Sequence, residues 1–214
     1  FSALCYYQGS LDYNLDQTST ESAINELQEF LNSYPNSERA KNIDQMIDEL
    51  TYKLELKAYE NARQYFKMGE YKSANIAFDN VLNDFPSTKL RPKIYDYIMK
   101  SRYELALNSV FDLKRDRLES ALAFTRQIEK ELPSTEYSKT ALELRGKLVK
   151  EKEDFAKVEK QVEIQKAEFK KKQQEFEAKE AEKNQLDAKK SAEAARRDSA
   201  KINTPAPAAT INIK

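Results

Sequence analysis

The 214-residue chain contains no histidine, no tryptophan and a single cysteine. Without histidine, it can form neither an imidazole-ligated metal site nor a Ser-His or Cys-His catalytic pair. We interpret the cysteine, Cys5, as a small buried core residue, because it lies among Phe1, Leu4 and Tyr7. The alternative is a lipid-bearing cysteine after a signal peptide, but no apolar stretch precedes Cys5, and Leu4 is large for the cleavage position.

Glycine and proline are also scarce, at three and six residues, whereas 34% of the residues are charged and the net charge is zero. This composition favours long solvated helices over sheets and provides no sustained basic surface for nucleic acid. There is no glycine-rich phosphate loop. The carboxylate pairs Asp44–Asp48 and Asp112–Asp116 are one helical turn apart, which is typical of solvated helix faces. We therefore predict a protein that is not an enzyme and that needs no cofactor or metal.

Three segments of the chain align without a gap: Ser22–Ser37, Ser73–Thr88 and Ser120–Thr135. Each begins with a Ser-Ala pair and has a proline twelve residues after the alanine. The alanines are Ala23, Ala74 and Ala121, and the prolines are Pro35, Pro86 and Pro133. Alanine lets two helices approach closely, and proline ends a helix because it lacks an N–H group. The repeat predicts stacked helical hairpins.

The middle copy has the clearest spacing. We expect Ala58, Ala62 and Tyr65 to share the packed face of one helix, with Gly69 ending it. The order Ala62, Tyr65, Gly69, Tyr71, Ala74, Phe78, Pro86 resembles the tetratricopeptide (TPR) consensus, and Leu27 and Thr125 replace Phe78 in the outer copies. The packing residues are thus predicted to be Ala23, Pro35, Ala62, Gly69, Ala74, Phe78, Pro86, Ala121 and Pro133.

The predicted fold is all-α, a TPR-like solenoid of antiparallel helix hairpins followed by a long C-terminal helix. Residues 1–148 hold about three repeats, the first incomplete; residues 149–201 form a charged helical arm, and residues 202–214 a disordered Pro/Ala tail. The span from Glu38 to Met68 has no glycine or proline and predicts a long helix. Gly9–Thr20 reads as a loop, with Ser19 or Thr20 capping the next helix.

The arm carries a thin stripe of apolar residues one heptad apart: Phe155, Val162, Phe169 and Phe176. The other seam positions of a coiled coil would be Gln165, Lys172 and Lys179, which would make half of the seam polar. One interpretation is a single solvated helix steadied by Glu/Lys pairs one turn apart. The other is an arm whose stripe docks on a partner.

An array of this kind binds partners through side chains of the first helix in each hairpin. Tyrosine and arginine combine a large contact area with directional hydrogen bonds. The candidates are Tyr59, Arg63, Tyr95 and Arg102, together with Arg115 and Arg117 in the stretch after Phe111, which we expect to be rich in loops.

Two stretches carry a more specific family resemblance. Asp12–Ser37 (DYNLDQTSTESAINELQEFLNSYPNS) resembles the third repeat of the outer-membrane assembly lipoprotein family BamD, and Leu50–Thr88 resembles its fourth. The resemblance covers about residues 1–148. It implies a scaffold of the β-barrel assembly complex that is lipid-anchored on the periplasmic face of the outer membrane of a Gram-negative bacterium.

The resemblance also implies partners. The C-terminal repeats would dock a periplasmic POTRA domain of a BamA-like barrel subunit, alongside other assembly subunits and unfolded outer-membrane protein substrates. Because the chain begins inside an apolar helix without Met, we expect the true N-terminus and the lipid anchor to lie upstream. The alternative function is a periplasmic TPR adaptor for cell division or for peptidoglycan-associated machinery, which would predict a trimeric coiled coil and no lipid anchor.

Overall fold

The computed structural model describes residues 2–202, with side chains described up to residue 193. This part of the chain forms seven helices and no strand, which confirms the predicted all-α fold with a long C-terminal helix. The helices are α1 (Ser2–Gln8), α2 (Thr18–Ser33), α3 (Ala40–Lys67), α4 (Tyr71–Asp84), α5 (Arg91–Leu107), α6 (Phe111–Glu131) and α7 (Glu136–Ile202). The predicted tail from Asn203 onward lies outside the described residues.

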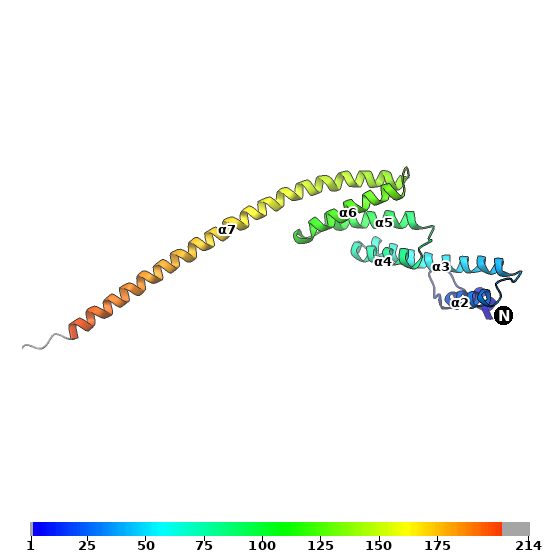
Figure 1. Cartoon of the computed structure of the whole chain (residues 1–214), viewed down its shortest axis with the longest axis horizontal. Coiled ribbons are helices and arrows are strands. Elements are labelled where there is room, and N and C mark those ends of the chain that lie inside the picture. Colours follow the sequence, from blue (N-terminus) through cyan, green and yellow to red (C-terminus); the bar gives the residue numbers. More distant parts are fainter. Residues whose placement is uncertain (1, 203–214) are drawn as a thin grey trace, which may run out of the picture. The chain divides into compact units, whose positions relative to one another are not determined.

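Consecutive helices pack against one another from α1 to α6, as Figure 1 shows. Three groups of buried side chains fill the spaces between them. The first lies between α1, α2 and the first half of α3. The second joins the rest of α3 to α4, α5, α6 and the start of α7, and the third joins α5 and α6 to α7. Each group is built mainly from neighbouring helices, which is the local packing expected of a solenoid.

The repeated alanines and prolines explain this packing. Ala23, Ala62 and Ala74 are fully buried, as is Phe78, and Ala121 is nearly so. Each proline stands two residues after a helix: α2, α4 and α6 end before Pro35, Pro86 and Pro133. The residue between, as at Phe85, donates its N–H to a carbonyl one turn back, here Val81 O at 2.9 Å.

Gly69 separates α3 from α4 at a backbone φ of +78°. Only glycine adopts this left-handed conformation without a steric penalty. The long helix predicted over Glu38–Met68 is α3, which runs for 28 residues. The glycine therefore sets the tight turn after an unusually long first helix.

Three local predictions were wrong. Cys5 is exposed, because Ala3 and Tyr7 form the side of α1 that packs and Cys5 lies between them on another face. Neither Ser19 nor Thr20 caps α2: the helix already begins at Thr18, and the buried Thr20 hydroxyl donates to Gln17 Oε1 at 2.8 Å. Tyr65 is 42% exposed, since the packed face of α3 is rotated by one residue.

The chain divides into two units, Phe1–Phe155 and Ala156–Lys214. The sequence placed this boundary at residue 148. Leu148 and Phe155 both pack with Leu118 of α6, so α7 belongs to the compact unit for two more turns. None of the described helices is both long enough and apolar enough to span a membrane.

Candidate partner-binding surface

Tyr59 lies in the core of the compact unit, although we expected it to face a partner. Only 6% of its surface is exposed, and its ring lies 6.0 Å from that of Phe78 and 6.1 Å from that of Tyr97. Burial raises the pKa of its hydroxyl to about 12. The expected exposure was wrong because Tyr59, Ala62 and Phe66 form the packed face of α3.

Tyr95 is also buried, with 6% of its surface exposed. Its ring meets Phe124 of α6 edge-on at 5.7 Å, and its hydroxyl accepts a hydrogen bond from Arg91 Nη1 at 3.3 Å. Burial raises its pKa. Tyr95 therefore joins α5 to α6, and its ring has little surface left for a partner.

Arg102 stacks on Phe124 as well. Its guanidinium carbon lies 4.4 Å from the ring centroid, and burial lowers its pKa while the charge of Asp79 opposes that shift. A desolvated cation on an aromatic face contributes on the order of 1–2 kcal/mol. Arg102 is thus half-buried between α4, α5 and α6, and only part of it can reach a partner.

The remaining candidate arginines are closer to the surface. Arg63 pairs with Glu60 one turn back on α3 at 2.5 Å. Arg115 and Arg117 lie within α6, so the expectation of a loop-rich stretch after Phe111 was wrong. Arg117 donates to Ser109 Oγ at 3.0 Å, which ties the start of α6 to the connection from α5.

The start of α6 also exposes an apolar group that sequence reasoning missed. Val110 is 65% exposed, Leu113 45% and Phe111 39%. Together with Arg115 and Arg117 they form the α6 edge, the name used below for these five residues. Its signal in the sequence was the run SVFDLKR, in which three large apolar residues stand close together without a proline or glycine.

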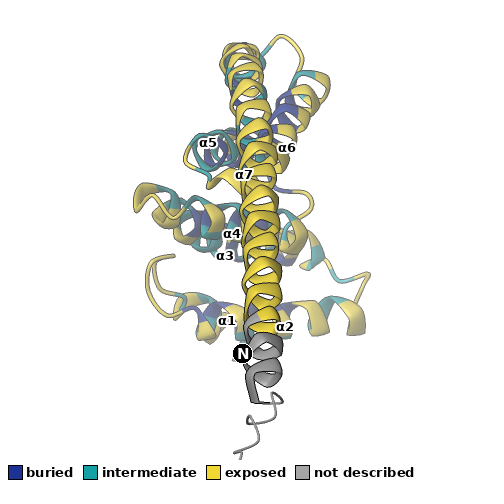
Figure 2. Cartoon of the chain, turned by 90° about the vertical axis from the view of Figure 1, so that its left-hand side faces the viewer, coloured by how far each residue is buried: buried dark blue, intermediate teal, exposed yellow. Residues whose placement is uncertain are grey.

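The arm stripe divides into a packed and an exposed part. Phe155 is buried, with its ring 5.2 Å from that of Phe111 and its ring centroid 5.8 Å from Lys114 Nζ. Val162 is half-buried, whereas Phe169 and Phe176 are 71% and 66% exposed. Figure 2 shows α7 exposed along most of its described length. The last two phenylalanines belong to none of the three buried groups.

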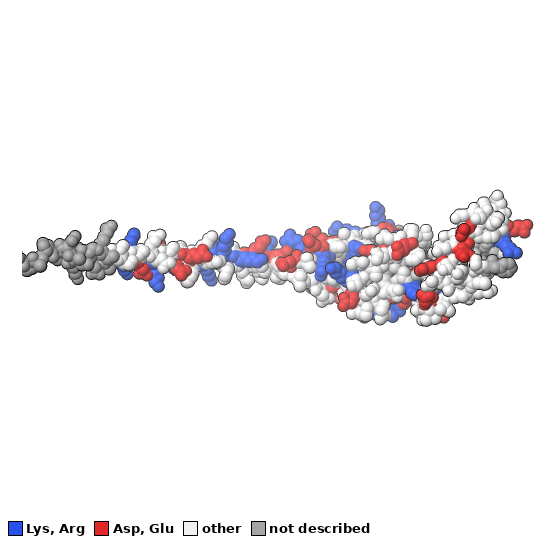
Figure 3. All heavy atoms as spheres, turned by 90° about the horizontal axis from the view of Figure 1, so that it is seen from below, with Lys and Arg blue, Asp and Glu red and all other residues white. Residues whose placement is uncertain are grey.

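Charges of both signs are scattered in small groups over the face seen in Figure 3. In the described part of the chain, no three carboxylate or cysteine side chains gather in a way that could hold a metal ion. The α6 edge and the last two phenylalanines of the stripe add exposed apolar side chains to this surface.

Comparison with known proteins gives two results. The model of the YfiO family, described as outer membrane lipoprotein, matches residues 2–118, which span α1 to the first part of α6. The outer membrane protein assembly factor BamD of Caulobacter vibrioides is 29% identical over 106 residues, which make up 50% of this chain and 35% of that protein. The chain thus spans about a third of the length of this curated relative. Since the family match covers more than half of the chain, the protein belongs to the YfiO family of outer membrane lipoproteins.

Proposed function

We propose that the protein is a non-enzymatic scaffold in the assembly of outer-membrane β-barrel proteins. The observation that carries this proposal is the family match from α1 to the first part of α6, which covers most of the compact unit. Tightly packed hairpins hold surface side chains in fixed positions, so these side chains lose less conformational entropy when a partner binds. The resemblance to the BamD family supports a position at the periplasmic face of the outer membrane, where a lipid anchor upstream of Phe1 would hold the protein.

The partner we propose is a periplasmic POTRA domain of a BamA-like barrel subunit, docking on the α6 edge. Val110 and Leu113 provide exposed apolar surface, and Arg115 and Arg117 flank it with positive charge. Apolar centres bordered by arginine are typical of binding hot spots. Tyr59 and Tyr95 lie in the core, where they pack α3 to α6 together, while Arg63 and Arg102 add charge on α3 and α5.

Beyond the family match, we propose that Val162, Phe169 and Phe176 dock on a helix of a second assembly subunit. Val162 is half-buried, and Phe169 and Phe176 are mostly exposed, at intervals of one heptad. Spacing of one heptad suits a single partner helix. Unfolded outer-membrane proteins are the substrates that the complete scaffold would serve.

Co-purification from detergent-solubilised outer membranes tests the proposed docking. The complete protein with Val110→Asp and Leu113→Asp should recover the barrel subunit several-fold less well than the unchanged protein, because two desolvated charges would face an apolar contact. Ile76→Asp is the matched control, since Ile76 is 55% exposed on α4 and lies outside the α6 edge. Equal recovery by all three proteins would exclude docking through the α6 edge.

A further inference from the structure

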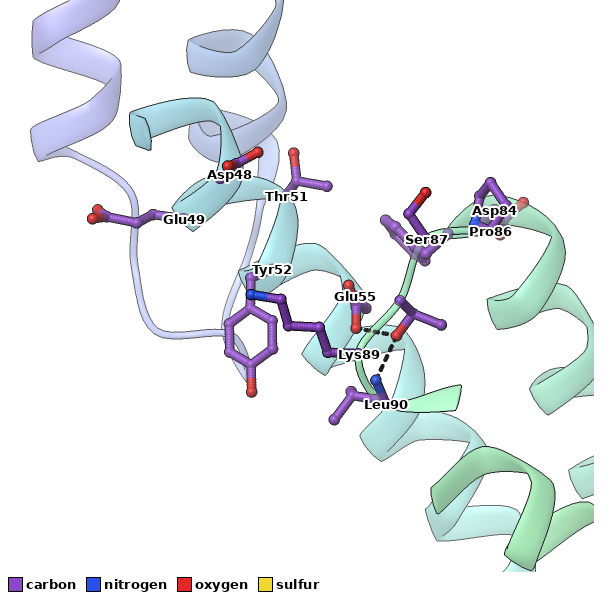
Figure 4. Close-up of a pocket in the computed structure, with 12 residues that line it drawn as sticks. Asp48, Glu49, Thr51, Tyr52, Glu55, Asp84, Pro86, Ser87, Lys89 and Leu90 are labelled. Carbon is purple, nitrogen blue, oxygen red and sulfur yellow. Dashed lines mark hydrogen bonds between the residues drawn. The ribbon is translucent and has the colours of Figure 1, made fainter. Parts of the chain in front are cut away.

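A groove of about 690 Å³ opens on the compact unit between the middle of α3 and the connection from α4 to α5. Figure 4 shows the two walls facing each other. The α3 wall consists of Asp48, Glu49, Thr51, Tyr52 and Glu55, and the connection contributes Asp84, Phe85, Pro86, Ser87, Thr88, Lys89 and Leu90. Its volume falls in the range of ordinary ligand sites.

Glu55 is the buried carboxylate among the residues that line this groove, with 7% of its surface exposed. Its Oε1 accepts a hydrogen bond from the Thr88 hydroxyl, which in turn accepts the Leu90 N–H at 2.9 Å. Figure 4 shows this chain of two bonds across the groove. The position of Glu55 is therefore fixed by the opposite wall.

The second oxygen of Glu55, Oε2, accepts no hydrogen bond from the described residues, and Glu55 forms no ion pair with them. Within the described part of the chain, the polar atoms sealed from solvent without a partner are Asn75 Oδ1 and Ser101 Oγ. Glu55 lines the groove, and its Oε2 is not one of these sealed atoms. No lysine or arginine of the described residues pairs with this carboxylate, so it can still accept a charge-assisted hydrogen bond from a cation.

The other lining residues of the groove are suited to binding a cation that a second molecule provides. Asp48, Tyr52 and Glu55 lie at i, i+4 and i+7 along one face of α3, and the Tyr52 ring is 47% exposed. The lining holds four carboxylates against one base, Lys89. The nearby lysines of α3 bind elsewhere: Lys53 Nζ donates to Ser10 Oγ at 2.7 Å, and Lys57 Nζ donates to Leu15 O.

We propose that this groove binds an extended peptide segment of a partner protein through one lysine or arginine side chain. The cation pairs with Glu55 Oε2, its alkyl stem lies against Pro86, and the Tyr52 ring and the Asp48 carboxylate attract its charge from the same face of α3. The site lies on the side of α3 and α4 and shares no residue with the α6 edge, so it stands apart from the proposed scaffold function.

Amide chemical shifts of the isotope-labelled full chain, titrated with a heptapeptide, test this inference. The probe is acetyl-Gly-Ser-Ala-Arg-Ala-Ser-Gly-amide, and its twin carries the neutral isostere citrulline in place of arginine. The arginine peptide should give saturable shifts at Thr51, Tyr52, Thr88 and Lys89, and the citrulline peptide should bind at least about fivefold more weakly, because the ion pair is lost. Added salt should weaken the arginine peptide alone.

Glu55→Gln keeps the size of the side chain and the hydrogen bond from Thr88. It should reduce the affinity for the arginine peptide to the affinity for the citrulline peptide. Tyr52→Ala should also weaken binding, and it keeps the inference testable should Glu55→Gln disturb the fold, since Tyr52 is largely exposed. Asp44→Asn is the matched control: it removes a carboxylate from an exposed position of α3 outside the groove and should change nothing. Equal binding of the two peptides, unchanged affinity in Glu55→Gln or Tyr52→Ala, or no saturable shift would each overturn the proposal.

Discussion

Gly69 and Gly146 make a matched pair in which the same substitution has opposite consequences. Gly69 has a φ of +78°, and a Cβ built there meets no atom within 4 Å. The cost of Gly69→Ala therefore comes from the backbone alone. An L-residue in the left-handed region costs about 1–2 kcal/mol, and the stiffer unfolded chain returns about 0.4–1 kcal/mol. The net expectation is a loss of about 1 kcal/mol.

Gly146 lies within α7 and likewise has open space at its Cβ. In a helix interior, alanine is more favourable than glycine by about 1 kcal/mol, so Gly146→Ala should stabilise the protein by about that amount. Urea unfolding followed by circular dichroism at 222 nm measures both changes, which should differ by about 2 kcal/mol. A neutral or stabilising Gly69→Ala would refute the assignment of this turn.

Three further predictions follow from the core and the arm. Phe78→Ala should lower the free energy of unfolding in urea by about 3–5 kcal/mol, because it leaves a cavity beside Tyr59 and Tyr97. Ile76→Ala, at an exposed position, should change this free energy by no more than about 0.5 kcal/mol. A similar small change in both variants would contradict the assigned core. The pKa of Tyr59 is raised to about 12 in the folded protein, so above pH 10 this side chain ionises first in the unfolded chain. About 2–3 kcal/mol of stability should therefore be lost as the pH rises from 10 to 12, and Tyr59→Phe should remove this loss. An identical alkaline loss in Tyr59→Phe would contradict the assigned burial of Tyr59. Phe169→Ser with Phe176→Ser should leave the urea midpoint of the compact unit and the mass measured by light scattering unchanged, since both rings are mostly exposed; a trimer that dissociates on this change would favour the coiled-coil alternative.

The hairpins were predictable because their signals are local. The gap-free repeat fixed the ends of α2, α4 and α6, and the absence of glycine and proline between Glu38 and Met68 predicted α3. These features depend on backbone chemistry within a few residues, and they act in the same way wherever the segment packs.

The candidate surface was less predictable because it depends on the rotation of each helix. Tyr65 and Tyr59 are six residues apart on α3, yet one is exposed and the other buried. Shifting the packed face by one residue, about 100°, exchanges their roles. The heptad spacing of the stripe likewise does not reveal that Phe155 meets Phe111 while Phe169 is 71% exposed.

The groove could not have been predicted from the sequence at all. Its defining hydrogen bond joins Glu55 to Thr88, 33 residues apart. In the sequence, Glu55 is one of many glutamates on a charged helix, and only the packing of the α4–α5 connection against α3 buries it. The burial of such a carboxylate can be recognised only from the folded structure, in which both walls of the groove are present.

The most direct test of the central claim is the affinity of this chain for the purified periplasmic domains of the barrel subunit from the same organism. Biolayer interferometry with the barrel-subunit domains immobilised should show saturable binding by the unchanged chain. The chain with Arg115→Glu and Arg117→Glu should dissociate several-fold faster, because reversed charges at the α6 edge weaken the bound complex. Lys130→Glu with Lys139→Glu, a double reversal at exposed positions outside the α6 edge, should bind as the unchanged chain does. Absence of binding by the unchanged chain, with the barrel domains folded, would contradict the assignment of this protein as their scaffold.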